Sequence, residues 1–354
     1  MSQFLIASNT SAVFVQTQSA LGTFVNAAAT PANAIRVVGT PKFAPRGAGI
    51  IQRADIYTPF GGGQAAVTGG IGWDITFQTE LFWRFDETPG SSTQYVTTTM
   101  SQLSALWLAS PWAVTLPAGN DVAMTVQPYF FADVDRATQA YAVQPFSIVY
   151  EESNGKRYEA FDCVCVPKFS WESGGKIMID WTVKGKWRDV TSSANVTPVY
   201  PEQYGTPAPQ PPLIGQNAAL SLTGFFGSST NALSKVTVDT GWAISDVADT
   251  RQAYGFGLGF IALTTYPTIA VEVANFAESV EPDWTTAQAN TVATNKLQVT
   301  LTVGSNSIIF TLAEAQLIEW PAPGDANGYR NIGLKFGGIP NSGQTTVMSI
   351  LFNS

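Results

Sequence analysis

The sequence predicts a mainly β protein with two tandem related β-domains, each a sandwich-like or barrel-forming unit with one flanking helix. Three observations predict this class. Apolar and polar residues alternate strictly in several runs, turn residues separate these runs, and one pattern occurs twice. The stretch that ends near residue 188 reads strand, Ser-Asn turn, strand, strand, Ser-Gly turn, strand, and the residues from 297 to the end repeat that order. A repeated β-unit indicates a repeated surface, and therefore assembly before catalysis.

The N-terminal region contains two segments that do not read as ordinary elements. Residues 1–35 are rich in Ala, Thr and Asn and offer few apolar anchors, so we expect an extended arm. Residues 40–72 form a glycine-rich, apolar excursion that is costly to order on one subunit. We expect neighbouring subunits to order it; the alternative is a flexible segment. Its candidate residues for contacts between subunits or rings are Phe60, Gly61, Gly62, Gly63 and Val67.

Three runs alternate with period two, which is typical of half-buried strands. The apolar positions are Trp73, Ile75, Phe77, Leu81 and Trp83 in the first run, Ile177, Ile179, Trp181 and Val183 in the second, and Leu297, Val299, Leu301 and Val303 in the third. The opposite faces carry mainly Thr and Gln with an occasional carboxylate. We expect these faces to be solvated walls, not catalytic clusters.

Turn and helix signals agree with this reading. Asn154-Gly155 lies between two alternating runs and predicts a hairpin with a type I′ turn, which needs positive φ twice. Residues 91–110 place apolar side chains at helical spacing, and Pro111 ends the pattern. Residues 282–293 are the weaker counterpart in the second half, because Thr and Asn lower helix propensity.

A proline-rich segment separates the two halves of the chain. Its prolines predict an extended, semi-rigid strap between domains. The chain is therefore divided into a first β-domain at 1–196, which includes the arm and the 40–72 excursion, a linker at 197–215, and a second β-domain at 216–354.

Composition argues against several functional classes. Only 12% of residues are charged, so few charges must lose water when neighbouring subunits pack. Histidine is absent, which removes the commonest general base and metal ligand, although a carboxylate pair remains open as a catalyst. The net charge is −8 and no basic patch is present, so we do not expect tight nucleic-acid binding. We therefore expect no enzyme activity and no cofactor.

The remaining signals favour structural roles. Cys163 and Cys165 are expected to share one strand face as small buried thiols, because a metal or redox role lacks partner ligands. Most tryptophans share a face with Ile and Val, which indicates core placement; a glycan-binding platform is the alternative. The start of the chain has neither the basic start nor the long apolar core of a signal peptide, and no apolar run is long enough for a membrane span.

Three passages carry a resemblance to a known family. They are VFVQTQSALGTFVNAAATPANAIRV near the start, FSIVYEESNGKRYEAFDCVCVPKFSWESGGKIMIDWTVKGKW in the middle, and YPTIAVEVANFAESVEPDWTTAQAN in the second half. Together with the order of elements and the composition, they resemble the major tail tube protein of long-tailed bacteriophages with non-contractile tails. The resemblance covers most of the chain, and no single motif in it is specific.

The resemblance implies a structural protein of the virion that is assembled in the host cytoplasm. Its copies would form rings that stack into a hollow tube, through which DNA leaves the capsid without specific binding. Two tube domains per chain would imply a ring of three chains, and a second domain outside the tube would restore six. The other partners would be tail proteins at the tube ends, and no membrane is involved. The candidates for lumen-facing residues are Asp74, Glu80, Asp180 and Glu272, with the outer surface as the alternative place.

Two rival functions remain. The chain could be another β-protein of the virion, such as a capsid decoration or minor tail protein. A glycan-binding β-module is the third reading.

Overall fold

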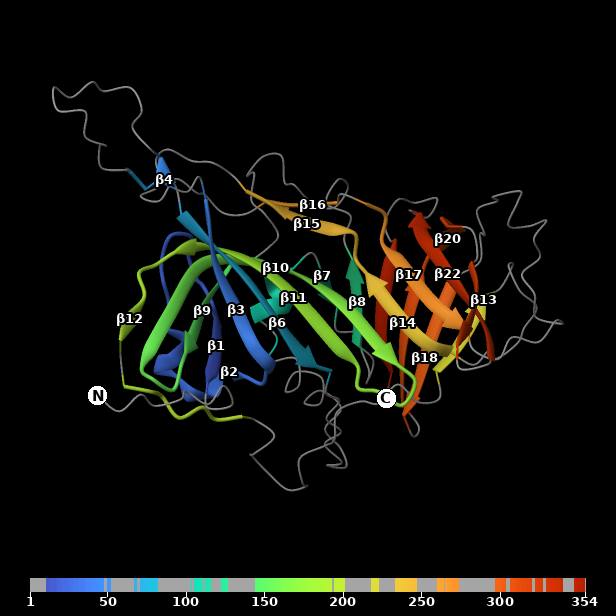
Figure 1. The fold of residues 1–354 in the computed structure, drawn as a ribbon, viewed down its shortest axis with the longest axis horizontal. Coiled ribbons are helices and arrows are strands. Elements are labelled where there is room, and N and C mark those ends of the chain that lie inside the picture. Colours follow the sequence, from blue (N-terminus) through green and yellow to red (C-terminus); the bar gives the residue numbers. More distant parts are fainter. Residues whose placement is uncertain are drawn as a thin grey trace.

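The computed structural model is built mainly of antiparallel strands (Figure 1). It describes residues 11–47, 50–51, 67–68, 71–81, 103, 105–110, 112–115, 122–126, 144–192, 194–200, 218–222, 233–246, 260–263, 265–273, 297–303, 306–319, 322–326, 329–339 and 347–353. The mainly β class predicted from the sequence is confirmed.

Thirteen of the described strands form one large sheet. They are β1 (Ala12–Thr17), β2 (Ala34–Ile35), β3 (Val38–Gly47), β6 (Ile71–Glu80), β9 (Phe146–Glu151), β10 (Lys156–Glu172), β11 (Met178–Trp187), β12 (Thr191–Ser192), β14 (Leu233–Asp239), β17 (Thr268–Val273), β20 (Glu314–Leu317), β21 (Ala322–Ala326) and β22 (Tyr329–Ile339).

Strand β10 connects the parts of this sheet. Along one edge its first residues pair with β9 and its last residues, 168–172, pair with β14. Along the other edge it pairs with β11, which continues into β6 and β3. A β-bulge at Asp162, whose φ is +48°, separates the two parts of β10. Such a bulge bends a strand, so β10 can serve two different neighbours on one edge.

Two four-stranded units with the same strand order lie side by side in the sheet. The first is β3-β6-β11-β10 and the second is β14-β17-β22-β20. Each unit places its first strand in the chain beside its second, then its fourth, then its third. All pairs are antiparallel, and the β10–β14 pair joins the units. The chain therefore repeats one strand order. Of the hairpins that the sequence predicts, β9–β10, β10–β11 and the one at 297–312 form, and the Ser-Gly hairpin near the C-terminus does not.

A second sheet of six strands combines both halves of the chain. Strands β7 and β8 come from the first half, and β8 pairs with β23, the last strand in the sequence. Both large sheets contain strands from the two halves of the chain. The division into two tandem domains is therefore not confirmed and stays a prediction. In spatial order the strands are β13 (Ala218–Leu222), β18 (Leu297–Val303), β19 (Asn306–Leu312), β23 (Met348–Asn353), β8 (Val122–Val126) and β7 (Trp112–Thr115).

Two small ribbons complete the described strands. Strand β4 (Ile50–Ile51) pairs with β5 (Val67–Thr68), and β15 (Trp242–Ser245) pairs with β16 (Phe260–Leu263). Two short 3-10 turns, Ala27–Ala29 and Pro31–Asn33, lie between β1 and β2. Residues 105–108 are helical and confirm the end of the predicted helix at 91–110, while its start and the predicted helix at 282–293 lie outside the described residues.

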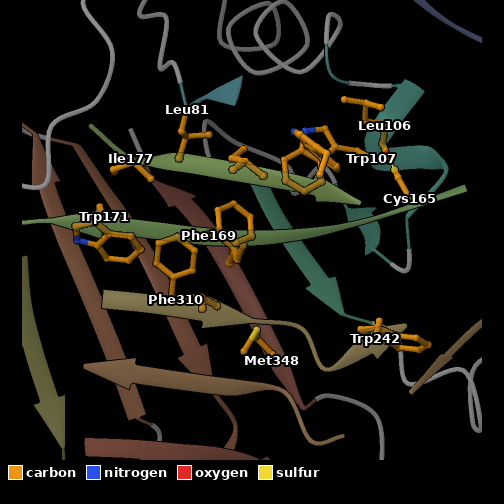
Figure 2. Packing of buried hydrophobic residues seen from close by; sticks show 14 of the residues in the cluster. Leu81, Leu106, Trp107, Cys165, Phe169, Trp171, Ile177, Trp242, Phe310 and Met348 are labelled. Atoms are coloured by element: carbon orange, nitrogen blue, oxygen red, sulfur yellow. Dashed lines mark hydrogen bonds between the residues drawn. The ribbon is translucent and has the colours of Figure 1, made fainter. Parts of the chain in front are cut away.

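Aromatic side chains fill the space between the two sheets (Figure 2). Phe310 of β19 meets Phe169 and Trp171 of β10 with ring centroids 5.4 and 5.3 Å apart. Trp107 of the helical segment packs edge-on against Trp181 at 5.0 Å. The apolar positions predicted in the three alternating runs are buried wherever their side chains are described, which confirms those strands. Core placement is likewise confirmed for Trp73, Trp171 and Trp181.

The expectation that residues 1–35 offer few core anchors is wrong for the described part, 11–35. Val13, Phe14 and Val15 of β1 are all buried. Val13 and Val15 face the main core, while Phe14 packs on the other side of the sheet against Ala27, Ala28 and Val149. A strand buried on both faces shows no alternation, which is why its pattern gave no strand signal.

Part of the 40–72 excursion is ordered by its own chain. Strand β3 pairs with β6 along residues 42–47, and β4 pairs with β5. The expectation that neighbouring subunits order this segment is therefore wrong for 40–47. Residues 48–49, 52–66 and 69–70 of the excursion lie outside the described part.

Two turn predictions need correction. The Asn154-Gly155 hairpin between β9 and β10 is confirmed, but only Gly155 has a positive φ, of +81°, so the turn is not type I′. The amide of Gly155 instead donates to the carbonyl of Glu152 at 2.9 Å, and a longer four-residue loop results. The predicted Ser-Gly hairpin near the C-terminus is also wrong, because β22 and β23 lie in different sheets.

Candidate functional site: the polar wall

The eight strands of the two four-stranded units present one continuous outward face, which we call the polar wall. Residues directly opposite one another on paired strands project to the same side of a sheet. One such row crosses all eight strands, through Val38, Gln78, Asp180, Lys168, Asp239, Thr268, Gly337 and Gln316.

Alternation along each strand explains why this face is polar. Buried residues such as Ile179 and Trp181 of β11 point into the core, so Asp180 and Thr182 between them must point outward. Strand β17 follows the same rule, with Ile269 buried and Glu272 exposed. The wall therefore has the polar, Thr-containing character that the sequence predicts.

The polar wall brings together all four acidic residues predicted as lumen-facing. Asp74 and Glu80 lie on β6 with the same parity as Gln78, Asp180 lies opposite Gln78, and Glu272 has the parity of Thr268. Their environments differ. Asp74 and Asp180 are partly exposed and Glu272 is exposed, but Glu80 is only 7% exposed. Glu80 forms an ion pair with Lys176, which explains how a carboxylate tolerates burial here.

Two lysines of the wall each lie between two carboxylates on neighbouring strands. Lys168 of β10 lies opposite Asp180 of β11 on one side and Asp239 of β14 on the other. Its Nζ is 3.0 Å from Oδ2 of Asp239. The Asp180 carboxylate also accepts a hydrogen bond from Nε2 of Gln78 at 2.5 Å.

Lys235 repeats this arrangement in the second unit. It lies opposite Glu172 of β10 and Glu272 of β17. Its Nζ is 3.7 Å from Oε1 of Glu172. We call these two acid–lysine–acid groups the charge triplets.

A third cluster of charged side chains lies where β3 ends and its partner β6 begins. Nε of Arg46 is 3.3 Å from Oδ1 of Asp74, and Asp246 pairs with both Arg46 and Lys184. Burial lowers the pKa of Arg46 below its ordinary value, and the adjacent Asp74 carboxylate opposes that shift. The charges in this cluster cancel, because two acids face two bases.

The groups named above hold seven carboxylates and five cations, so the wall keeps a small net negative charge, and each of these carboxylates lies beside a cation. Lys168 and Lys235 were not among the residues predicted from the sequence. Their positions in alternating strands, next to buried residues, nevertheless indicate that they lie on the outward face. Sequence reasoning could not find which acid faces which lysine, because strand register is set by pairing between distant segments.

A buried polar network lies where β10 bends. Asp162 is 1% exposed, and its Oδ2 is 2.7 Å from Nζ of Lys186. Its Oδ1 accepts hydrogen bonds from Nε2 of Gln18 at 3.0 Å and from the amide of Gly22 at 2.9 Å. Gln18 in turn accepts from the amide of Asp162 at 2.6 Å. This network ties the segment after β1 to the bulge.

A second buried ionic group anchors the start of the proline-rich strap. Arg157 pairs with Glu159 at 2.6 Å and with Glu151 at 3.5 Å. The other Glu151 oxygen accepts a hydrogen bond from the amide of Val196 at 2.9 Å, and the amide of Val199 donates to Pro31. The described part of the strap, up to 200, thus follows the sheet as an irregular segment.

The other predicted residues are placed as follows. Phe60, Gly61, Gly62 and Gly63 lie outside the described residues, and Val67 lies in β5 opposite Ile51. Cys163 and Cys165 are fully buried free thiols in the core, as expected, and burial raises the pKa of each well above its ordinary value. Cys165 Sγ donates to the carbonyl of Leu106 at 3.0 Å.

The described part of the chain lacks two kinds of feature. There, no three His, Cys, Asp or Glu side chains gather in a way that would hold a metal ion. The same residues contain no helix of the length and apolarity that a membrane crossing requires. Comparison with models of known families and with curated proteins found no match for this chain.

Proposed function

We propose that this chain is a structural virion protein whose copies form stacked rings of a hollow phage tail tube. The observation that carries the proposal is the polar wall, eight antiparallel strands wide and built from one strand order used twice. A protein that lines a channel needs a broad polar sheet on one side and a packed core on the other. The wall supplies the first, and the aromatic layer of Phe169, Trp171 and Phe310 supplies the second.

The width of the wall supports a ring of three chains. Strands lie about 4.8 Å apart, so eight strands span about 38 Å and three copies give a circumference of about 115 Å. Strand tilt widens a closed barrel, and a tilt of about 40° brings the diameter to about 48 Å. A DNA duplex fits inside such a ring. Both units contribute to one face, as Asp180 and Glu272 illustrate, so the second half is expected to line the channel and not to decorate its exterior.

The repeated strand order suggests how copies join. Within the chain, β10 is the third strand of its unit and pairs with β14, the first strand of the next unit. The counterpart edges are β20, the third strand of the second unit, and β3, the first strand of the first unit. Among the described strands, β3 pairs only with β6 and β20 only with β22. The edge formed by β20 and β21 of one copy is therefore the partner we assign to β3 of the next. Their directions give an antiparallel pair.

The test is to concentrate the purified chain and examine it by negative-stain electron microscopy, with the mass of single rings measured by native mass spectrometry. Hollow filaments assembled from three-chain rings are the expected result. Six-chain rings would retain the tube and reject the two-unit wall. Small closed oligomers without filaments would favour a decoration or minor tail protein, and retention of the chain on polysaccharide resin would favour a glycan-binding module.

A further inference from the structure

We propose that the charge triplets mask two lysines that would otherwise bind the phosphate backbone of nucleic acid. The inference rests on the proposed function for its partner, double-stranded DNA, and on the structure for its mechanism. Each triplet places one lysine between two carboxylates on adjacent strands, Asp180 and Asp239 for Lys168, and Glu172 and Glu272 for Lys235.

Lys168 and Lys235 are suited to phosphate contact if nothing competes for them. Their side chains are 48% and 47% exposed on the outward face of the wall. Lysine is a compact cation that binds phosphate as a point charge. Because the duplex carries one negative charge per about 1.7 Å of its axis, an unmasked pair of lysines would hold it wherever it touched the wall.

The flanking carboxylates oppose this binding in two ways. Asp239 already lies 3.0 Å from Nζ of Lys168, so a phosphate would have to displace it. Each triplet also carries one more negative charge than positive, so an approaching phosphate meets net repulsion at short range. The result is a polar surface along which a polyanion slides without being retained.

The arrangement differs from a simple acidic surface. A channel lined by unpaired acids alone would repel DNA uniformly, and removing two acids would only weaken that repulsion. Removing Asp239 and Glu172 here frees two specific cations instead. The wall would then gain affinity for DNA, with a salt dependence that reports how many lysines contact phosphate.

The experiment compares two double variants of the soluble chain at low protein concentration. Glu172→Gln with Asp239→Asn removes from each triplet the carboxylate that lies within ion-pair distance of its lysine, and we call it the unmasked variant. Glu152→Gln with Asp189→Asn is the matched control, because neither acid lies in a strand of the wall and each accepts a hydrogen bond, from Asn154 and from Trp187, that an amide oxygen can also accept. Each pair raises the net charge from −8 by two, to −6. Binding to a short double-stranded DNA fragment is measured by fluorescence anisotropy over a range of salt concentrations.

We expect the unmasked variant to gain DNA affinity, with a slope of log affinity against log salt that is steeper by about two than that of the unchanged chain. Adding Lys168→Gln and Lys235→Gln to that variant removes the gain. Equal gains in both double variants would show an effect of net charge alone and overturn the proposal, as would no gain in either. Matching thermal unfolding of all variants confirms that the surface changes leave the fold intact.

The outcomes separate this inference from the proposed function. Tubes together with an unchanged DNA affinity would reject the masking while the tail-tube proposal stands. A gain in DNA affinity without tubes would retain the masked lysines and reject the tube.

Discussion

Gly185 in β11 lies directly against Cys163 in β10, within the large sheet. A Cβ atom at Gly185 would stand 2.5 Å from Cys163 Sγ and 3.1 Å from Cβ of Ala160. Both neighbours are fully buried, so neither has free space to move into. The two strands therefore approach each other only because residue 185 has no side chain.

Gly185→Ala is expected to lower the free energy of unfolding by about 1–3 kcal/mol, the usual cost of overpacking a core. Gly333→Ala in β22 is the matched control, because a Cβ there meets nothing within 4 Å. It should be neutral or slightly stabilising, since alanine loses less backbone entropy than glycine. Urea denaturation measures both, and adding Cys163→Ala to Gly185→Ala should recover part of the loss. Equal effects of the two glycine substitutions would contradict the packing argument.

At the scale of elements, β10 decides how the large sheet is built, and its bulge depends on Asp162. The φ of +48° is one that Asp and Asn adopt more readily than other residues with side chains. The carboxylate also neutralises Lys186, which is only 8% exposed. Loss of Asp162 would remove the carboxylate that lies 2.7 Å from that buried ammonium.

Asp162→Ala is expected to destabilise the chain by about 3–5 kcal/mol, the usual cost of removing one partner of a buried ion pair. Asp162→Asn should cost less, because the amide keeps an acceptor for Gln18 and tolerates the same φ. The double variant with Lys186→Met should be more stable than Asp162→Ala alone, since the buried charge that faced Asp162 is gone. Denaturant unfolding of the unchanged chain, Asp162→Ala, Lys186→Met and the double variant forms a double-mutant cycle, and strict additivity would refute a coupled pair.

The sequence pattern predicted the strands that have one buried and one solvent-exposed face. Strands β6, β11 and β18 alternate because one face meets the core and the other meets solvent, so period two reveals them. Strand β1 is buried on both faces and was read as an arm. The second predicted hairpin failed for a different reason. A local pattern shows that β22 and β23 are strands, but their pairing with β17 and β19 depends on contacts far away in the chain.

The candidate site was predictable to a similar extent. Parity placed Asp74, Glu80, Asp180 and Glu272 on polar faces, and the structure shows that these faces form a single wall. Their partners were not predictable, because Lys176 lies outside a strand and the lysines of the triplets reach their acids across strand pairs. Register therefore adds what parity alone does not show, namely that these carboxylates lie beside cations.

At the scale of the whole molecule, the order β3-β6-β11-β10 followed by β14-β17-β22-β20 has a geometric consequence. Within the chain, the first unit joins the second through β10 and β14. The two ends of the wall are then β3, the first strand of its unit, and β20, the third strand of its unit. Within one chain, these two edge strands can form backbone hydrogen bonds with each other only if the wall closes on itself. Repetition by further copies continues the wall until it closes as a ring, which removes every exposed edge of the wall.

The intrachain joint also limits how much of β3 takes part. Only five residues of β10, 168–172, pair with β14. The first half of β3 is its more exposed part, with Val38, Gly39, Thr40 and Lys42 exposed, so we expect the contact there. Pro41 lies inside this stretch and has no N–H, so the proposed pair lacks one ladder hydrogen bond at that position, which an edge strand tolerates.

Disulfide trapping tests this joint. Cysteines are introduced singly at Val38, Thr40 or Lys42 of β3, each combined with Gly324→Cys in β21, and the assembled protein is oxidised gently. Because a disulfide needs Cα atoms within about 7 Å, at least one combination should link neighbouring copies into a covalent ladder that ends at the ring size. The buried native thiols, whose pKa values are raised, should not compete.

Thr76→Cys with Gly324→Cys is the control, since Thr76 is equally exposed but lies one strand further into the wall. That extra strand adds about 4.8 Å and puts residue 76 out of reach. A ladder that ends at three chains would fix both the joint and the symmetry at once, because the ladder stops growing where the ring of copies closes. Tubes in which none of the three β3 positions cross-links better than residue 76 would show that the copies meet through other edges, although they still form a channel.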